Sequence, residues 1–139
     1  MPILTRVWIK TALVYFILSL TLGIFLVLDT AGLLTLPVPG LFPSYIHFLV
    51  LGWVTQLIMG VAFWMFPKYS QQQPRRSEPL GWVSYYCLNL GLILRLVGEP
   101  LNAATQAAWA GWIMAIAAGL LLAGGTAFVV NTWGRVKEK

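Results

Sequence analysis

Two ionisable side chains stand inside long apolar stretches of this 139-residue chain. His47, the single histidine, heads the run YIHFLVLGWVTQLIMGVAFWMFP, and Arg95 lies in NLGLILRLVGEPL. A neutral imidazole is a common ligand of metals and of heme iron. A planar guanidinium can hold a carboxylate through two parallel hydrogen bonds. Binding of a metal or a cofactor is therefore the chemistry that these residue types offer, provided that the surrounding elements position them for it.

The composition places the chain in a lipid bilayer. Hydrophobic residues make up 59% of the sequence and charged residues 9%, whereas soluble proteins carry about 25% charged residues. Four segments have the roughly 20 apolar residues that a helix needs to cross a hydrocarbon core of ~30 Å, namely 7–28, 44–66, 80–98 and 106–130. Continuous apolar runs favour helices over a barrel. The sequence predicts an all-α membrane protein, with one antiparallel four-helix transmembrane domain over residues 1–139.

The cations indicate how the helices are oriented. Eight of the nine lysines and arginines flank the spans on one side: Arg6, Lys10, Lys68, Arg75, Arg76, Arg135, Lys137 and Lys139. The connections 29–43 and 99–105 contain none. Cytoplasmic loops carry the excess of lysine and arginine, so we expect both termini to be cytoplasmic. This bias and an attraction to anionic lipid head groups account for the net charge of +5 without a nucleic-acid partner.

Prolines, serines and small residues predict where helices begin, end and pack. Ser44 and Ser77 are placed to cap the second and third helices, and Pro100 marks the end of the third span near Glu99. Small residues recur every fourth position in two spans: Gly52, Gln56 and Gly60 in the second, and Gly111, Ala115, Gly119, Ala123 and Ala127 in the fourth. We expect both stripes to pack inside the bundle, with a contact between two copies as the alternative use.

His47 is expected to lie near the outer end of the second helix. In a regular α-helix it shares a face with Val54, Ile58, Val61 and Met65, nearly opposite Gly52, Gln56 and Gly60. One interpretation is an interfacial histidine that hydrogen-bonds a carbonyl or water. The other is a ligand of a metal or heme iron.

Arg95 lies at a similar depth near the outer end of the third span, and it has two possible partners. Glu99 follows four residues later, so an intrahelical ion pair is one of them. A carboxylate of a bound ligand, such as a heme propionate, is the other. Ionisable groups inside a membrane are candidates for a functional role and need a named partner.

The stretch from Tyr45 to Pro67 resembles the second helix of subunit I of heme-copper oxidases, particularly the C-type oxidases and nitric oxide reductases. It is also similar to the short four-helix relatives of that subunit, whose third helix the segment 89–101 resembles. In these families a histidine followed by a Gly-Trp step ligates low-spin heme b. It corresponds to His47, with Gly52 and Trp53 following.

The resemblance implies a membrane heme b protein of a prokaryotic inner (cytoplasmic) membrane that transfers electrons or binds a diatomic gas such as NO or O2. His47 is the expected axial ligand, Arg95 the expected propionate partner, and Phe48, Gly52 and Trp53 the expected surroundings of the porphyrin. The chain lacks the further histidines of an oxidase heme-copper centre, so we do not expect oxygen reduction by that mechanism. Three methionines are conceivable sixth ligands: Met59, Met65 and Met114.

Other functions and assemblies remain open at this stage. A heme-free accessory subunit of a larger complex would suit the small-residue stripes. A small proton-coupled transporter is disfavoured, because Asp29, Glu78, Glu99 and Glu138 are all expected at helix ends or in loops. Because each chain offers one histidine, a homodimer that shares one heme between two His47 imidazoles is the simplest low-spin construction. The redox partner is not indicated by the sequence.

Overall fold

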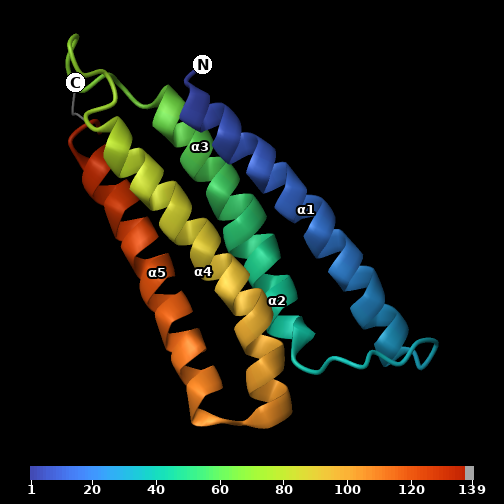
Figure 1. The fold of residues 1–139 in the computed structure, drawn as a ribbon. Coiled ribbons are helices and arrows are strands. Elements are labelled where there is room, and N and C mark those ends of the chain that lie inside the picture. Colours follow the sequence, from blue (N-terminus) through green and yellow to red (C-terminus); the bar gives the residue numbers. More distant parts are fainter. Residues whose placement is uncertain (137–139) are drawn as a thin grey trace.

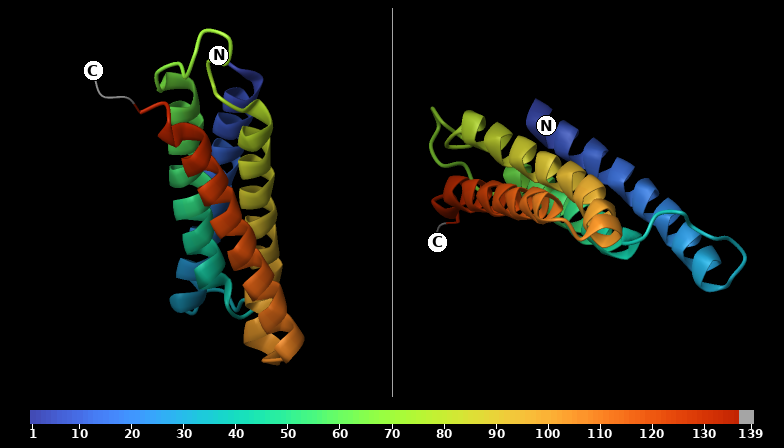
Figure 2. Two further views of the ribbon diagram at one scale, coloured as in Figure 1. Left: turned by 90° about the vertical axis from the view of Figure 1, so that its left-hand side faces the viewer. Right: turned by 60° about the horizontal axis from the view of Figure 1, so that its bottom comes forward.

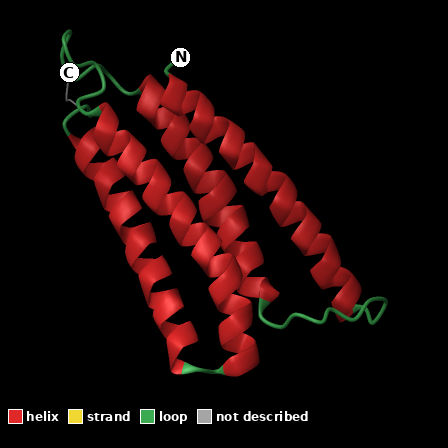
Figure 3. Cartoon of the chain, in the orientation of Figure 1, coloured by secondary structure: helices red, strands yellow, loops and turns green. Residues whose placement is uncertain are grey.

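The protein is a set of long helices, seen in a computed structural model that describes residues 1–136 (Figures 1 and 3). The elements are α1 (Ile3–Thr30), α2 (Leu41–His47), the π-helix η1 (Phe48–Thr55), α3 (Gln56–Met65), α4 (Glu78–Thr105) and α5 (Ala108–Trp133). The second span is continuous from α2 through η1 to α3. The described residues form no strand, and four helices are long and apolar enough to cross a membrane. The all-α class of an integral membrane protein is thereby confirmed.

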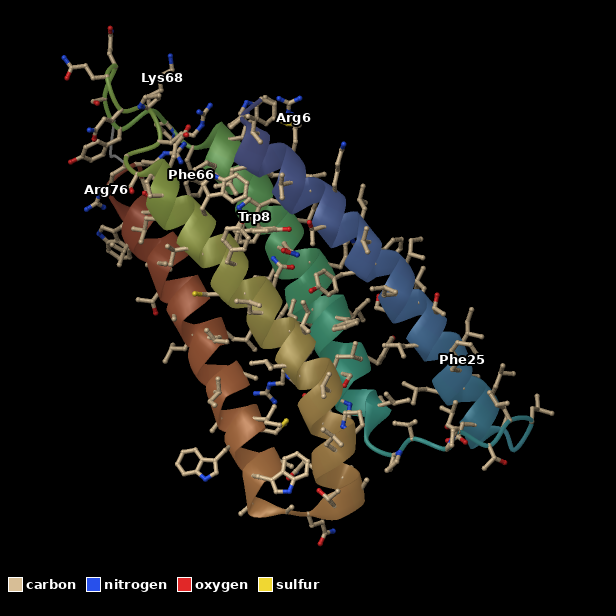
Figure 4. The ribbon with its side chains drawn as sticks, viewed as in Figure 1. Arg6, Trp8, Phe25, Phe66, Lys68 and Arg76 are labelled. Atoms are coloured by element: carbon tan, nitrogen blue, oxygen red, sulfur yellow. The ribbon has the colours of Figure 1, made fainter. Side chains whose placement is uncertain are left out.

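The second span and α4 form the middle of the bundle, with α1 and α5 on opposite sides of them (Figure 2). The start of α1 and the end of α5 lie at the same end of the bundle, which we call the termini end, and the opposite one is the far end (Figure 1). Arg6, Lys68 and Arg76 gather at the termini end, whereas Phe25 lies toward the far end (Figure 4). Lys137 and Lys139, which the sequence analysis also assigns to this side, lie outside the described residues.

Two glycines of the second span let it approach α1 closely. A Cβ atom added at Gly52 would lie 2.7 Å from the ring of Tyr15, and one at Gly60 would lie 2.7 Å from Trp8. The buried Gln56 lies between them, facing α4. The prediction that the stripe in the second span packs inside the bundle is thus confirmed.

The stripe in the fourth span lies on the outside of the bundle, so the prediction of internal packing is wrong there. Gly111 and Gly119 are exposed, and a Cβ atom at either would meet nothing within 4 Å. Residues seven apart pack on α4 instead: Ala110, Ala117, Gly124 and Asn131 are buried. Helix α5 carries two rows of small side chains, and residue size alone does not distinguish the row that faces α4.

Helix α4 is longer than the sequence indicates. It continues through Pro100 to Thr105, whereas the proline was expected to end the span near Glu99. Proline removes one backbone N–H, a loss that membrane helices tolerate. Ser77 caps α4 as expected, since its Oγ accepts a hydrogen bond from the Leu80 N–H at 3.3 Å. Ser44 caps nothing, because α2 already begins at Leu41 after Gly40.

Arg135, just after α5, links that helix to the end of α3 at the termini end of the bundle. Its side chain is buried and donates hydrogen bonds to the carbonyl oxygens of Phe63, Phe66 and Pro67 at 2.9, 2.8 and 3.1 Å. Phe63 lies in the last turn of α3, and Phe66 and Pro67 follow that helix directly, so the cation stabilises its carboxyl end. Burial lowers the pKa of the Arg135 guanidinium, and the charge of Arg75 adds to the effect. Arginine nevertheless stays protonated at neutral pH.

Candidate functional site

His47 is the last residue of α2, directly before the π-helix η1. Gln56 follows nine residues later, and at roughly 100° per residue the two would point to opposite sides of the helix. A π-helix bonds from i to i+5 and advances by less per residue, roughly 85°, which brings His47 and Gln56 to within about 45° of each other. Both side chains face α4, where they bond Glu99 and Asn89. The predicted separation of His47 from Gln56 is therefore wrong, because the prediction assumed a regular α-helix.

Glu99 of α4 is the centre of the site. One carboxylate oxygen, Oε1, lies 3.0 Å from His47 Nδ1 and 3.3 Å from Arg95 Nη1. The other, Oε2, accepts a hydrogen bond of 2.6 Å from the Ser44 hydroxyl. Only 3% of the Glu99 side chain is exposed. Three partners from two helices therefore surround a buried carboxylate, as a buried charge requires.

The placement of Glu99 corrects the sequence analysis. The expectation that every carboxylate lies at a helix end or in a loop is wrong for this residue, because α4 continues six residues beyond it to Thr105. The spacing of Arg95 and Glu99 was a usable signal for the pair, and that ion pair is present. No signal in the sequence pointed to Ser44 as the second helix's contribution to the carboxylate.

The imidazole of His47 is held through one nitrogen. Nδ1 lies 2.8 Å from the Pro43 carbonyl oxygen and 3.0 Å from Glu99 Oε1. Both are acceptors, so the contacts assign the proton to Nδ1. Nε2 has no hydrogen-bond partner among the described residues. This is the arrangement of a ligating histidine, whose second nitrogen donates to a carboxylate or carbonyl while the first keeps its lone pair for a metal.

Arg95 donates a hydrogen bond to Glu99 and has further N–H donors. Its Nη1 bonds Glu99 Oε1 at 3.3 Å, which is the intrahelical pair. Its Nε is buried and has no hydrogen-bond partner within residues 1–136. A buried donor without a partner is uncommon in folded proteins. The guanidinium therefore has hydrogen-bonding capacity for a ligand besides its bond to Glu99.

His47, Arg95 and Glu99 line one cavity of about 380 Å³ at the far end. Its other walls are Gly40, Pro43, Asn102, Ala103 and Met114. Met114 is the one conceivable sixth ligand that lines this cavity. Met59 is buried in the core instead, and Met65 is exposed near the other end of the second span.

Phe48, Gly52 and Trp53 are not brought to this cavity. Phe48 packs edge-on against Tyr15 with ring centroids 4.9 Å apart, and Trp53 lies over Phe16 at 4.1 Å. Gly52 also faces Tyr15. All three residues thus face α1, on another side of the second span from the His47 cavity. The expected porphyrin wall is therefore not formed by these residues in the structure.

Within residues 1–136, no three or more histidine, cysteine, aspartate or glutamate side chains are grouped to hold a metal ion. A heme places a smaller demand on the protein, since the porphyrin supplies four ligands and the chain only axial ones. The free Nε2 of His47 and the unpartnered Nε of Arg95 fit a heme iron and a propionate respectively.

The chain matches no family model, no curated protein and no solved structure.

Proposed function

We propose that this protein is a membrane heme b protein in which His47 is an axial ligand, and that it transfers electrons or binds a diatomic gas. The observation that carries the proposal is the state of the His47 ring. Its Nδ1 lies beside two acceptors, Pro43 O and Glu99 Oε1, and its Nε2 has no partner in the described part of the chain. The His47 side chain is 26% exposed and lines the cavity of about 380 Å³, so a ligand in that cavity can reach the ring.

Each residue of the site has a definite part in this proposal. Ser44 and Arg95 hold the Glu99 carboxylate, and Glu99 together with Pro43 holds the imidazole in one tautomer and orientation. Arg95 would also donate its remaining N–H groups to a propionate. A bound heme supplies one-electron chemistry or a site for a gas, and its environment sets the potential.

The orientation in the membrane follows from the termini end. Arg6, Lys68 and Arg76 gather there (Figure 4), together with the loop 66–77. We infer that this end is cytoplasmic, because lysine and arginine accumulate on that side. The His47 cavity at the far end then lies in the outer half of the bilayer, and the inner membrane of a prokaryote is the proposed location.

The second axial ligand has two possible sources. Met114 lines the cavity within the same chain. A second copy could instead contribute its own His47, giving the homodimer with one shared heme. The outward stripe of α5 supports close approach of two copies, because Gly111 and Gly119 leave open space at the helix surface. We propose the shared site, since two imidazoles are stronger ligands for a low-spin heme b than one imidazole and a thioether.

An absorption spectrum of the detergent-purified protein, oxidised and then reduced, tests the function. We expect a Soret band and the sharp reduced bands of a low-spin heme b. A colourless protein after expression with sufficient heme supply would contradict the proposal and leave a heme-free accessory subunit as the better account.

One observation favours a second candidate function. Glu99 is a buried carboxylate inside a membrane-spanning helix, the feature that a proton-coupled transporter needs and that the sequence analysis did not find. Transport would require no heme. A colourless protein that acidifies or alkalises a proteoliposome lumen in a Glu99-dependent manner would support this candidate.

A further inference from the structure

Hydrogen bonds are exchanged at Gln56, the first residue of α3, directly after the π-helix η1. In an α-helix the Gly52 carbonyl accepts a bond from the backbone N–H of residue 56. Here the Gln56 backbone N–H is directed to the Trp53 carbonyl. The side-chain amide of the same residue donates to Gly52 O at 3.2 Å instead. At Gly52 O the Gln56 side chain thus takes the place of the backbone N–H of the same residue.

Asn89 of α4 fixes the orientation of that amide. Its Nδ2 donates to Gln56 Oε1 at 2.9 Å and also to its own helix at Tyr85 O, at 2.8 Å. Gln56 is fully buried. With its oxygen held by Asn89, the amide of Gln56 can present only its nitrogen to Gly52 O. The pair therefore links α4 to the Gly52 carbonyl, which in an α-helix would accept a bond from the Gln56 backbone N–H.

We infer that Gln56 and Asn89 are positioning residues for His47. They stabilise Phe48–Thr55 as a π-helix, and the π-helix turns His47 toward Glu99. Without their bonds, the Gln56 N–H can return to Gly52 O and the segment can become α-helical. An α-helix has fewer residues per turn than a π-helix, so the His47 side chain would then point away from α4 by roughly a third of a full rotation about the helix axis. The imidazole loses Glu99, which is 3.0 Å from Nδ1.

The inference deepens the proposed function and rests on it in one respect. The orientation of the ring affects heme binding because Nε2 is the proposed ligand atom. The test itself needs no heme. The chain has a single histidine, so heme-free protein labelled with 15N-histidine gives one pair of imidazole signals. We expect wild-type protein to show an Nδ1 proton that is protected from exchange by its bonds to Pro43 O and Glu99 Oε1.

The decisive variants are Gln56→Leu and Asn89→Leu. Both should lose the protonated Nδ1 signal and show the averaged signals of a solvent-exchanging ring. Asn89→Leu keeps the Gln56 side chain and is the milder change, so it serves if Gln56→Leu does not fold. Tyr85→Phe is the matched control. It removes another interhelical hydrogen bond of α4, 2.8 Å from Tyr85 Oη to Thr11 Oγ1, without touching η1.

The outcomes separate this inference from the proposed function. Loss of the Nδ1 signal in both leucine variants, with Tyr85→Phe unchanged, supports the positioning role. Unchanged signals in Gln56→Leu and Asn89→Leu, or equal loss in Tyr85→Phe, overturn it. A wild-type protein with the expected signals that takes up no heme would refute the proposed function and leave the positioning role in place.

Discussion

At the scale of single residues, the site is organised by a carboxylate rather than by the histidine that first attracts notice. Glu99 receives His47, Arg95 and Ser44 from two helices. His47 and Arg95 could be singled out from sequence, because an ionisable side chain is rare in an apolar segment. Glu99 could not be assigned to the interior, because a proline follows it and such a residue is normally at a helix boundary. Ser44 was expected only as a helix cap, and Met114 was one of three conceivable ligands that nothing in the sequence distinguished.

Removal of the Glu99 carboxylate should destabilise the protein. Glu99→Leu leaves the Arg95 charge without its partner and frees the Ser44 and His47 donors in a buried site, so we expect a loss of about 3 kcal/mol in the free energy of unfolding. Glu78→Gln is the matched control, because the Glu78 side chain is 65% exposed and pairs with Arg75 at the surface. We expect a change of about 0.5 kcal/mol or less there. Reversible denaturation in detergent measures both, and equal losses would argue against a special role for Glu99.

At the scale of elements, the positions of the spans follow from composition. Which face of each helix is turned toward which neighbour does not. Apolar length is enough to locate four helices, because a bilayer demands about 20 apolar residues per crossing. The π-helix η1 has more residues in each turn than an α-helix. It therefore changes which side chains of the second span share a face. That change depends on Asn89, which is 33 residues away from Gln56 in the chain. Periodicity within one segment therefore could not place His47 correctly.

The contact between the second span and α1 depends on the absence of a side chain at Gly52. In Gly52→Ala the new methyl group would lie 2.7 Å from the Tyr15 ring, so we expect a loss of about 1–3 kcal/mol in the free energy of unfolding. Gly125→Ala is the control, because nothing lies within 4 Å of a Cβ atom there. It should be neutral or stabilise α5 by up to about 1 kcal/mol, since alanine is the better helix former. Similar losses in both variants would mean that the close approach of α1 is not important.

At the scale of the whole molecule, the proposed orientation rests on charge and the proposed dimer rests on the open face of α5. Single cysteines at Leu34 and Gln72, in a Cys87→Ala background, test the orientation. Leu34→Cys lies in the connection between α1 and α2 and should react with an impermeant maleimide in intact cells. Gln72→Cys, in the loop before α4, should react only after the cells are opened. The reverse pattern would place the His47 cavity on the cytoplasmic side.

The ratio of heme to protein tests the proposed homodimer. We expect one heme for two chains, a low-spin spectrum and no change on addition of carbon monoxide, because two imidazoles would occupy both axial positions. Met114→Leu should then leave the spectrum unchanged. One heme per chain with a spectrum that shifts readily in carbon monoxide would exclude the shared site and favour an open or weakly held sixth position.

The most direct test of the central claim is the heme content of two His47 variants. His47→Ala removes the side chain, and His47→Asn keeps an N–H donor near the place of Nδ1 for Glu99 and Pro43 while removing Nε2. We predict that both variants lose essentially all bound heme, and that His47→Asn keeps the helix content and stability of the wild-type protein. Wild-type heme content in a folded His47→Asn protein would contradict the account.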